Sequence, residues 1–166
     1  SAAFAAFEKL AATDQHNRDP RARPAAADQV RTAAARVQAL WPDAPQPWII
    51  LGELATYNAD GLRFGPGCDN ATAETCYRRA LDARPGHAPA HARLARLYEV
   101  NGRPADAARE WRAAAACDPS NFTYHYRRGR LLQQQGQDTA ALACYRAALR
   151  FWEGATRTRA ALEREI

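Results

Sequence analysis

Arginines are the residues of this 166-residue chain whose spacing most clearly indicates a chemical role. Arg93 and Arg96 recur 34 positions later as Arg127 and Arg130. Residues three apart share a helix face, and guanidinium groups bind carboxylates through two parallel hydrogen bonds. The pattern therefore predicts a basic helical surface that binds an extended or helical peptide with acidic side chains or a free C-terminal carboxylate.

The same arginines have a second interpretation as a solvated face that pairs internally with Glu99 or Glu110. The net charge is +5, and 22 of the 23 basic residues are arginine. Together with the many alanines and prolines, this composition is typical of a GC-rich genome, so the arginine excess partly reflects codon bias. It is weak evidence for a nucleic-acid partner, because the position of the arginines matters more than their number.

Histidines and cysteines are the other candidate metal ligands and disulfide partners. His87 and His91 lie one helical turn apart, but no carboxylate or cysteine stands at ligand spacing, so no metal site is predicted. Cys68 and Cys76 lie close in sequence, and a local disulfide between them is feasible if the protein is exported. The alternative is four buried or half-buried thiols in a reducing compartment; an exported, periplasmic location is slightly favoured.

Catalysis and cofactor binding are not expected from the sequence. Ser1 and Ser120 are the only serines, and neither belongs to a nucleophile, base and acid constellation. The glycines near position 66 lack the lysine of a phosphate-binding loop. Two Asn-x-Thr triplets, Asn70–Thr72 and Asn121–Thr123, coincide with expected helix starts, where such side chains cap the first turn.

The elements that would position these side chains follow a 34-residue period. The unit Gly86–Pro119 begins again at Ser120, so that small, aromatic and proline residues superpose. The superposed pairs are Pro85 with Pro119, Gly102 with Gly136, Ala107 with Ala141, Trp111 with Tyr145 and Ala114 with Ala148. Small residues such as Gly52, Ala95 and Gly129 let two helices approach closely. We expect aromatic residues such as Tyr77, Trp111 and Tyr145 to fill the space between neighbouring helix pairs.

The period and its residues resemble the tetratricopeptide repeat, a helix–turn–helix unit of 34 residues. The first copy has Trp48, Leu51, Gly52, Ala73, Tyr77, Ala80 and Pro85, the second has Leu94, Ala95, Tyr98, Ala107, Trp111, Ala114 and Pro119, and the third has Gly129, Leu132, Ala141, Tyr145 and Ala148. The third copy departs from the pattern at Arg128 and Glu153.

The resemblance implies an all-α, right-handed superhelical solenoid of antiparallel helix pairs, because single pairs cannot bury their apolar faces alone. We expect one domain over residues 1–166 with about 3.5 to 4 repeats. Its parts would be a degenerate repeat at 4–44, a repeat at 45–87 with an insert at 58–69, regular repeats at 88–121 and 122–155, and a capping helix at 156–166. A first helix is expected at 2–13 and a second at 24–41, followed by helices near 47–57, 70–84, 88–100, 104–117, 122–135 and 138–152.

The resemblance also implies which side chains contact a partner, since the first helix of each tetratricopeptide repeat lines the inner surface. Carried onto this sequence, the peptide-binding residues are Ile49, Glu53, Tyr57, Arg93, Arg96, Glu99, Tyr126, Arg127, Arg130 and Gln133. Insertions in such repeats often contact a partner, and the alternative is a surface loop that is simply tolerated.

The predicted function is that of a protein–protein interaction scaffold or adaptor without enzymatic activity. One alternative is a structural subunit or assembly factor docked permanently in a larger complex, such as an exported bacterial one. Another is an RNA-binding helical repeat. Such repeats need base-reading side chains at fixed positions in every copy, and here only the arginines recur. No apolar run approaches the roughly 18 residues of a membrane helix, so no membrane insertion is expected.

Overall fold

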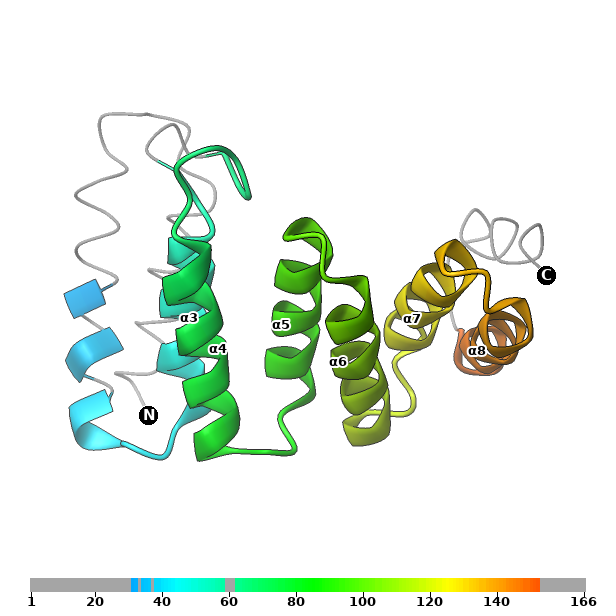
Figure 1. The fold of residues 1–166 in the computed structure, drawn as a ribbon. Coiled ribbons are helices and arrows are strands. Elements are labelled where there is room, and N and C mark those ends of the chain that lie inside the picture. Colours follow the sequence, from blue (N-terminus) through cyan, green and yellow to red (C-terminus); the bar gives the residue numbers. More distant parts are fainter. Residues whose placement is uncertain (1–30, 33, 37, 59–61, 153–166) are drawn as a thin grey trace. The chain divides into compact units, whose positions relative to one another are not determined.

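The computed structural model describes residues 31, 32, 34–36, 38–58 and 62–152. Within these residues it contains six helices with complete bounds, shown in Figure 1. They are α3 (Pro45–Ala55), α4 (Asn70–Ala83), α5 (Ala88–Val100), α6 (Pro104–Cys117), α7 (Phe122–Gln134) and α8 (Asp138–Phe151). No helix of the described part is long and apolar enough to cross a membrane. The prediction of an all-α fold is confirmed.

The helix bounds agree with the 34-residue period. Helices α5 and α6 occupy the predicted ranges 88–100 and 104–117, and α7 and α8 each end one residue before the predicted position. Helix α3 starts and ends two residues earlier than predicted, because two prolines begin its first turn and Thr56 ends it. The Thr56 hydroxyl donates to the Glu53 backbone oxygen at 2.6 Å.

Two compact units make up the chain, Ser1–Pro85 and Gly86–Ile166. In the first, α3 packs against α4; in the second, α5 packs against α6, α6 against α7, and α7 against α8. The boundary falls close to the point where the predicted repeat 45–87 gives way to the repeat 88–121. Each unit is therefore built from helix pairs, and one continuous domain over 1–166 stays a prediction.

Each helix pair closes where a small residue of the first helix meets an aromatic ring of the second. A Cβ added at Gly52 would lie 2.6 Å from Tyr77 Cε1, and one added at Gly129 would lie 2.8 Å from Tyr145 Cε1. Tyr77 and Tyr145 thus fill space inside their own pairs, so the prediction that they lie between pairs is wrong. Trp111 does reach the next pair, with its ring centroid 5.9 Å from that of Tyr124.

Glycines form the turns inside the two pairs of the second unit. Gly102 and Gly136 have φ values of +68° and +71°, a left-handed conformation that only glycine adopts at little cost. In the first unit the insert replaces this short turn. Among its described residues, Asn58 Oδ1 accepts from Leu62 N at 2.8 Å and Asn58 Nδ2 donates to Pro66 O at 2.9 Å.

Side-chain caps satisfy backbone amides at the starts of α7 and α4. Asn121 caps α7 by accepting from Thr123 N at 3.2 Å, as expected. Helix α4 is capped by Asp69, which accepts from Thr72 N at 2.9 Å. The expected cap at Asn70 or Thr72 is therefore corrected: Asn70 is already the first helical residue, and the carboxylate before it supplies the acceptor.

Several predicted elements lie outside the described residues. These are the first helix, most of the degenerate repeat 4–44 and the capping helix 156–166. Residues 31, 32, 34–36 and 38–40 of the predicted second helix are helical, and Ala34 is fully buried.

Candidate functional site

The predicted arginines of α7, Arg127 and Arg130, lie close together on the helix surface. At 100° per residue, Arg127 and Arg130 fall on one stripe together with Gln134. Tyr124, which contacts Trp111 of α6, precedes Arg127 by three residues, and Tyr126, which contacts Tyr145 of α8, precedes Arg130 by four. The two arginines therefore border the packed surface of the helix. Arg130 and Gln134 are exposed and Arg127 is half-buried.

The equivalent stripe of α5 holds Arg93, Arg96 and Val100, each 34 positions before its α7 counterpart. Both arginines are half-buried, and Val100 is 49% exposed. The charge of Arg93 reaches Tyr124: burial and the charge of Asp118 raise the pKa of Tyr124, whereas Arg93 lowers it. We call these six residues, Arg93, Arg96, Val100, Arg127, Arg130 and Gln134, the arginine face.

Two predicted peptide-binding residues instead face the second helix of their own repeat. Glu99 accepts a hydrogen bond from Trp111 Nε1 at 2.5 Å, and Gln133 accepts one from the Tyr145 hydroxyl at 2.8 Å. The repeat period places the same bond in both pairs. Each of the two side chains thus satisfies the polar tip of a buried aromatic side chain. Gln133 is exposed and Glu99 half-buried, and their assignment to the partner surface stays a prediction.

Tyr126 also belongs largely to the interior. Its ring centroid lies 6.0 Å from that of Tyr145, and it packs on the buried cluster formed by α7 and α8. Because it is only half-buried, part of the ring stays accessible beside Arg127 and Arg130.

The predicted residues of α3 lie in the first unit. Ile49 is buried, with 8% of its surface exposed, and belongs to the core. Glu53 and Tyr57 are half-buried and contact Arg63 of the insert: Glu53 forms an ion pair with it at 3.7 Å, and Tyr57 lies beneath its guanidinium. The structure thus places Glu53 and Tyr57 together, and Ile49 apart from them.

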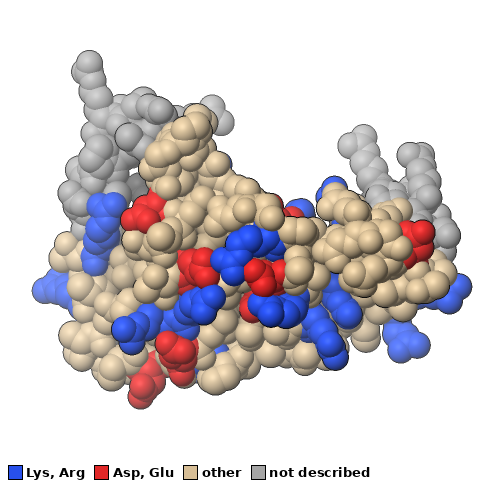
Figure 2. Space-filling model, viewed as in Figure 1, with Lys and Arg blue, Asp and Glu red and all other residues tan. Residues whose placement is uncertain are grey.

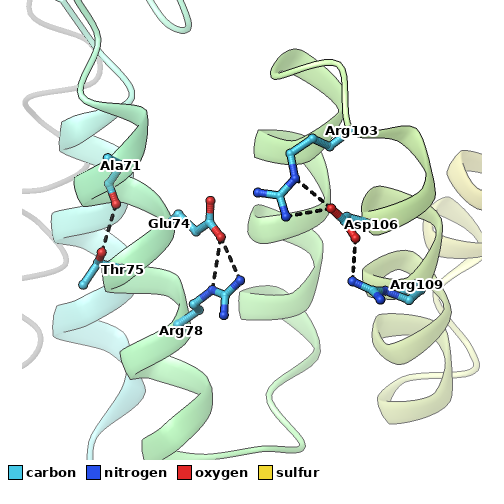
Figure 3. Close-up of polar contacts among 7 residues, drawn as sticks. All are labelled: Ala71, Glu74, Thr75, Arg78, Arg103, Asp106 and Arg109. Atoms are coloured by element: carbon cyan, nitrogen blue, oxygen red, sulfur yellow. Dashed lines mark hydrogen bonds and ion pairs between the residues drawn. The ribbon is translucent and has the colours of Figure 1, made fainter.

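Arginines at the start of α6 and on α4 are neutralised locally. Figure 3 shows Asp106 between Arg103 and Arg109, with ion pairs of 2.6 and 2.5 Å, and Arg78 paired with Glu74 at 2.8 Å. On the face seen in Figure 2, acidic and basic side chains accordingly lie side by side. This face does not carry charge of a single sign.

The carboxylates expected to neutralise the arginine face have other partners. Glu99 accepts from Trp111, and Glu110 contacts His91 Nδ1 at 2.7 Å. Within the described residues neither carboxylate forms an ion pair with an arginine, so this form of internal pairing is corrected.

Two of the described histidines contact a second helix, and a third caps the start of α5. His91 contacts Glu110 across the α5–α6 pair, and His87 accepts from Ala90 N at the start of α5. His125 stacks on Phe151 of α8, with 5.8 Å between the two ring centroids. In the described part of the chain, no group of three or more potential ligands could hold a metal ion.

All four cysteines are free thiols. Cys68 donates to the Thr56 backbone oxygen at 2.9 Å, whereas Cys76 is buried in α4, so the feasible Cys68–Cys76 disulfide is absent from the structure. Burial, followed by the charge of Asp69, raises the pKa of the Cys76 thiol. Burial likewise raises the pKa of Cys144, while Arg128 lowers it.

The tetratricopeptide repeat family model matches residues 69–121 and 93–156, which together cover more than half of the chain. The chain belongs to the tetratricopeptide repeat family. Membership of this family supports a general role of the chain as a protein–protein interaction scaffold. The matched residues include the whole arginine face.

Solved structures of MamA share this fold. One aligns with a TM-score of 0.61 and 17% identity over 76% of this chain and 68% of that chain. A second aligns with a TM-score of 0.59 and 17% identity over 75% of this chain and 63% of that chain. MamA MSR-1 C2 aligns with a TM-score of 0.54 and 18% identity over 76% of this chain and 67% of that chain. This chain thus spans about two thirds of their length. No curated protein matches the sequence.

Sequence reasoning missed Val100 and Gln134, which are exposed on the arginine face. It chose Glu99 and Gln133, their neighbours by one residue. Residues four apart share a helix face, and Glu99 follows the buried Ala95 by four, as Gln133 follows Gly129. That spacing is the signal that could have indicated a hydrogen bond from each to the second helix of its own pair.

Proposed function

We propose that this protein is a non-catalytic interaction scaffold that binds an acidic peptide segment on its arginine face. The observation that supports the proposal is the proximity of Arg127 and Arg130 on α7, where Arg130 is exposed and Arg127 is half-buried. Guanidinium groups bind carboxylates bidentately, so an acidic side chain or a C-terminal carboxylate is the fitting ligand.

The apolar and polar neighbours of the arginines refine this ligand. Val100, exposed at the end of α5, offers an aliphatic contact, while Gln134 occupies the same position on α7. Glu99 precedes Val100, and its carboxylate accepts a hydrogen bond from Trp111. An acidic group of the ligand would therefore lie over Arg127 and Arg130, with an aliphatic residue beside Val100.

The test compares two double charge reversals of equal net charge. Arg127→Glu with Arg130→Glu removes the proposed anchors, whereas Arg146→Glu with Arg150→Glu changes two exposed arginines of α8. A fluorescent peptide of alternating glutamate and leucine serves as the probe. We expect the first variant to weaken binding by about tenfold or more, since charge-assisted hydrogen bonds contribute about 1.5–3 kcal/mol each.

The control variant should bind within about threefold of the unmodified protein, since an exposed pair away from the site contributes little. Equal loss in both variants would show nonspecific attraction to a basic chain and would refute the site. Tighter retention of single-stranded RNA than of the peptide, with a steep salt dependence, would favour the nucleic-acid alternative.

A further inference from the structure

The insert between α3 and α4 is docked onto the last turn of α3. Phe64 N donates to the Thr56 backbone oxygen at 2.7 Å, and Asp69 N donates to the Ala55 oxygen at 3.0 Å. Tyr57 and Arg63 form an isolated antiparallel bridge. Figure 1 shows this segment as the loop beyond the ends of α3 and α4.

Arg63 is the side chain through which the insert reaches α3. Its guanidinium carbon lies 5.6 Å from the ring centroid of Tyr57 and 5.0 Å from that of Phe64. Its terminal nitrogen lies 3.7 Å from Glu53 Oε1, and its Nε donates to Thr56 Oγ1 at 3.3 Å. The side chains of Arg63 and Glu53 are 27% and 13% exposed.

The α3 groups around Arg63 are those that recognise a guanidinium. A carboxylate neutralises its charge, an aromatic face attracts the cation, and a hydroxyl oxygen accepts from Nε. The Thr56 hydroxyl is oriented for this role, because its own hydrogen is donated to the Glu53 backbone oxygen. Glu53, Thr56 and Tyr57 all come from one turn at the end of α3.

The other two pairs show that an insert is not required to join the helices. Three residues, Asn101–Arg103 and Gln135–Gln137, connect α5 to α6 and α7 to α8. We propose that Glu53, Thr56 and Tyr57 form a binding site for an arginine side chain, which Arg63 occupies in the free protein and which an arginine-bearing partner segment takes over.

This site is separate from the arginine face. It lies in the first compact unit, whereas Arg127 and Arg130 lie in the second, and it selects a ligand of the opposite charge. Two residues predicted to contact a peptide, Glu53 and Tyr57, keep that role here with an internal occupant. Failure of acidic-peptide binding at α7 would leave this proposal standing, and the reverse is also true.

The experiment removes the occupant and supplies its chemistry from outside. The probe is the blocked peptide acetyl-Leu-Arg-Phe-Gly-amide, which repeats residues 62–65. Titrated by NMR at low salt, the Arg63→Ala variant should bind this peptide at least tenfold more tightly than the unmodified protein, with shifts at Glu53 and Tyr57. The same peptide with lysine in place of arginine should bind several-fold more weakly, because ammonium lacks the planar fork.

A second variant separates a site from simple loss of structure. Arg63→Ala combined with Glu53→Gln should lose the gained binding while its circular dichroism matches that of Arg63→Ala. If Arg63→Ala does not fold, Arg63→Lys keeps the charge and should show a smaller gain. A folded Arg63 variant that binds the peptide no better than the unmodified protein would overturn the proposal and leave Arg63 a structural residue only.

Discussion

At the scale of single residues, one tyrosine shows how closely each helix pair is fitted. Tyr145 is almost fully buried: its ring lies against Gly129 and is tilted by 42° to the ring of Tyr126, and its hydroxyl donates to Gln133 Oε1. A ring held on three sides has little room to move, since protein interiors are close-packed. The absence of a side chain at Gly129 is thus a packing requirement.

Replacing Gly129 with alanine should destabilise the protein by about 1–2 kcal/mol. Overpacking typically costs about 1–3 kcal/mol, and the better helix propensity of alanine offsets roughly 1 kcal/mol of it at most. Urea unfolding followed by circular dichroism measures the change. Gln134→Ala, at an exposed position of the same helix, should stay within about 0.5 kcal/mol; a Gly129→Ala variant as stable as that control would contradict the close fit.

Small residues at the right spacing were enough to predict Gly52 and Gly129 as points of helix contact. The sequence could not tell whether an aromatic residue packs inside its own pair or against the next, because both positions bury the ring equally. The structure shows both: Tyr145 packs inside its pair, and Trp111 contacts Tyr124 as well.

At the scale of elements, helix starts illustrate what local chemistry decides. Asp69 caps α4, and hydrogen bonds from Thr72, first from its side chain and then from its backbone, lower the pKa of Asp69. A lowered pKa means that its stabilising effect is present above the ordinary value near pH 4 and is lost as the pH falls through the folded-state pKa.

Asp69→Ala should cost about 1 kcal/mol of unfolding free energy at pH 7, the usual effect of removing a cap. Asp69→Asn keeps a capping oxygen but has no charge to titrate, so it should cost less. Unfolding in urea at pH 7 and pH 3 measures both variants. The difference between the unmodified protein and the Asp69→Asn variant should shrink at pH 3, because protonation removes charge from the native carboxylate. An Asp69→Ala variant as stable as the unmodified protein at pH 7 would argue against capping.

The order of the insert could not be read from its sequence. Glycines and proline at 65–67 predicted a loop, and they predicted it correctly. The contacts of Asn58 and Arg63 depend on three-dimensional closure over several residues, for which no periodic signal exists. For the same reason the sequence assigned Glu53 and Tyr57 to an external partner and did not predict Arg63 beside them.

At the scale of the whole molecule, buried thiols make the stability of both units sensitive to alkaline pH. Cys76 belongs to the first unit and Cys144 to the second, and burial raises the pKa of each above the ordinary 9.0. The folded state therefore keeps protons that the unfolded state releases. Stability from this source is complete below about pH 9 and is lost as the pH rises through the folded-state values.

We expect the urea midpoint, measured under reducing conditions, to fall between pH 8 and pH 10. In a variant that combines Cys76→Ala with Cys144→Ala the fall should be shallower, because the two buried thiols no longer titrate. The comparison uses the slope of the urea midpoint against pH, so the lower absolute stability of the variant does not affect it. An unchanged slope would show that other groups govern the alkaline loss.

The repeat period predicted the helices of the second unit almost to the residue, since each 34-residue copy encodes the same local contacts. It carries no information on where a chain divides into compact units, because the period runs through Pro85 and Gly86 without a break. The contact between the successive pairs at α6 and α7 joins a side chain of the repeat pattern, Trp111, to one that the pattern leaves variable, Tyr124.

The bond from the Trp111 indole to Glu99 has a spectroscopic consequence. Trp111 and Trp152 belong to the second unit, and Trp41 and Trp48 to the first. An indole shielded from solvent, as Trp111 is, emits at shorter wavelength than one in water. With phenylalanine at positions 41 and 48, the tryptophan fluorescence of the chain would report on residues 86–166 alone. The unfolding of that unit could then be followed by the shift of its emission wavelength.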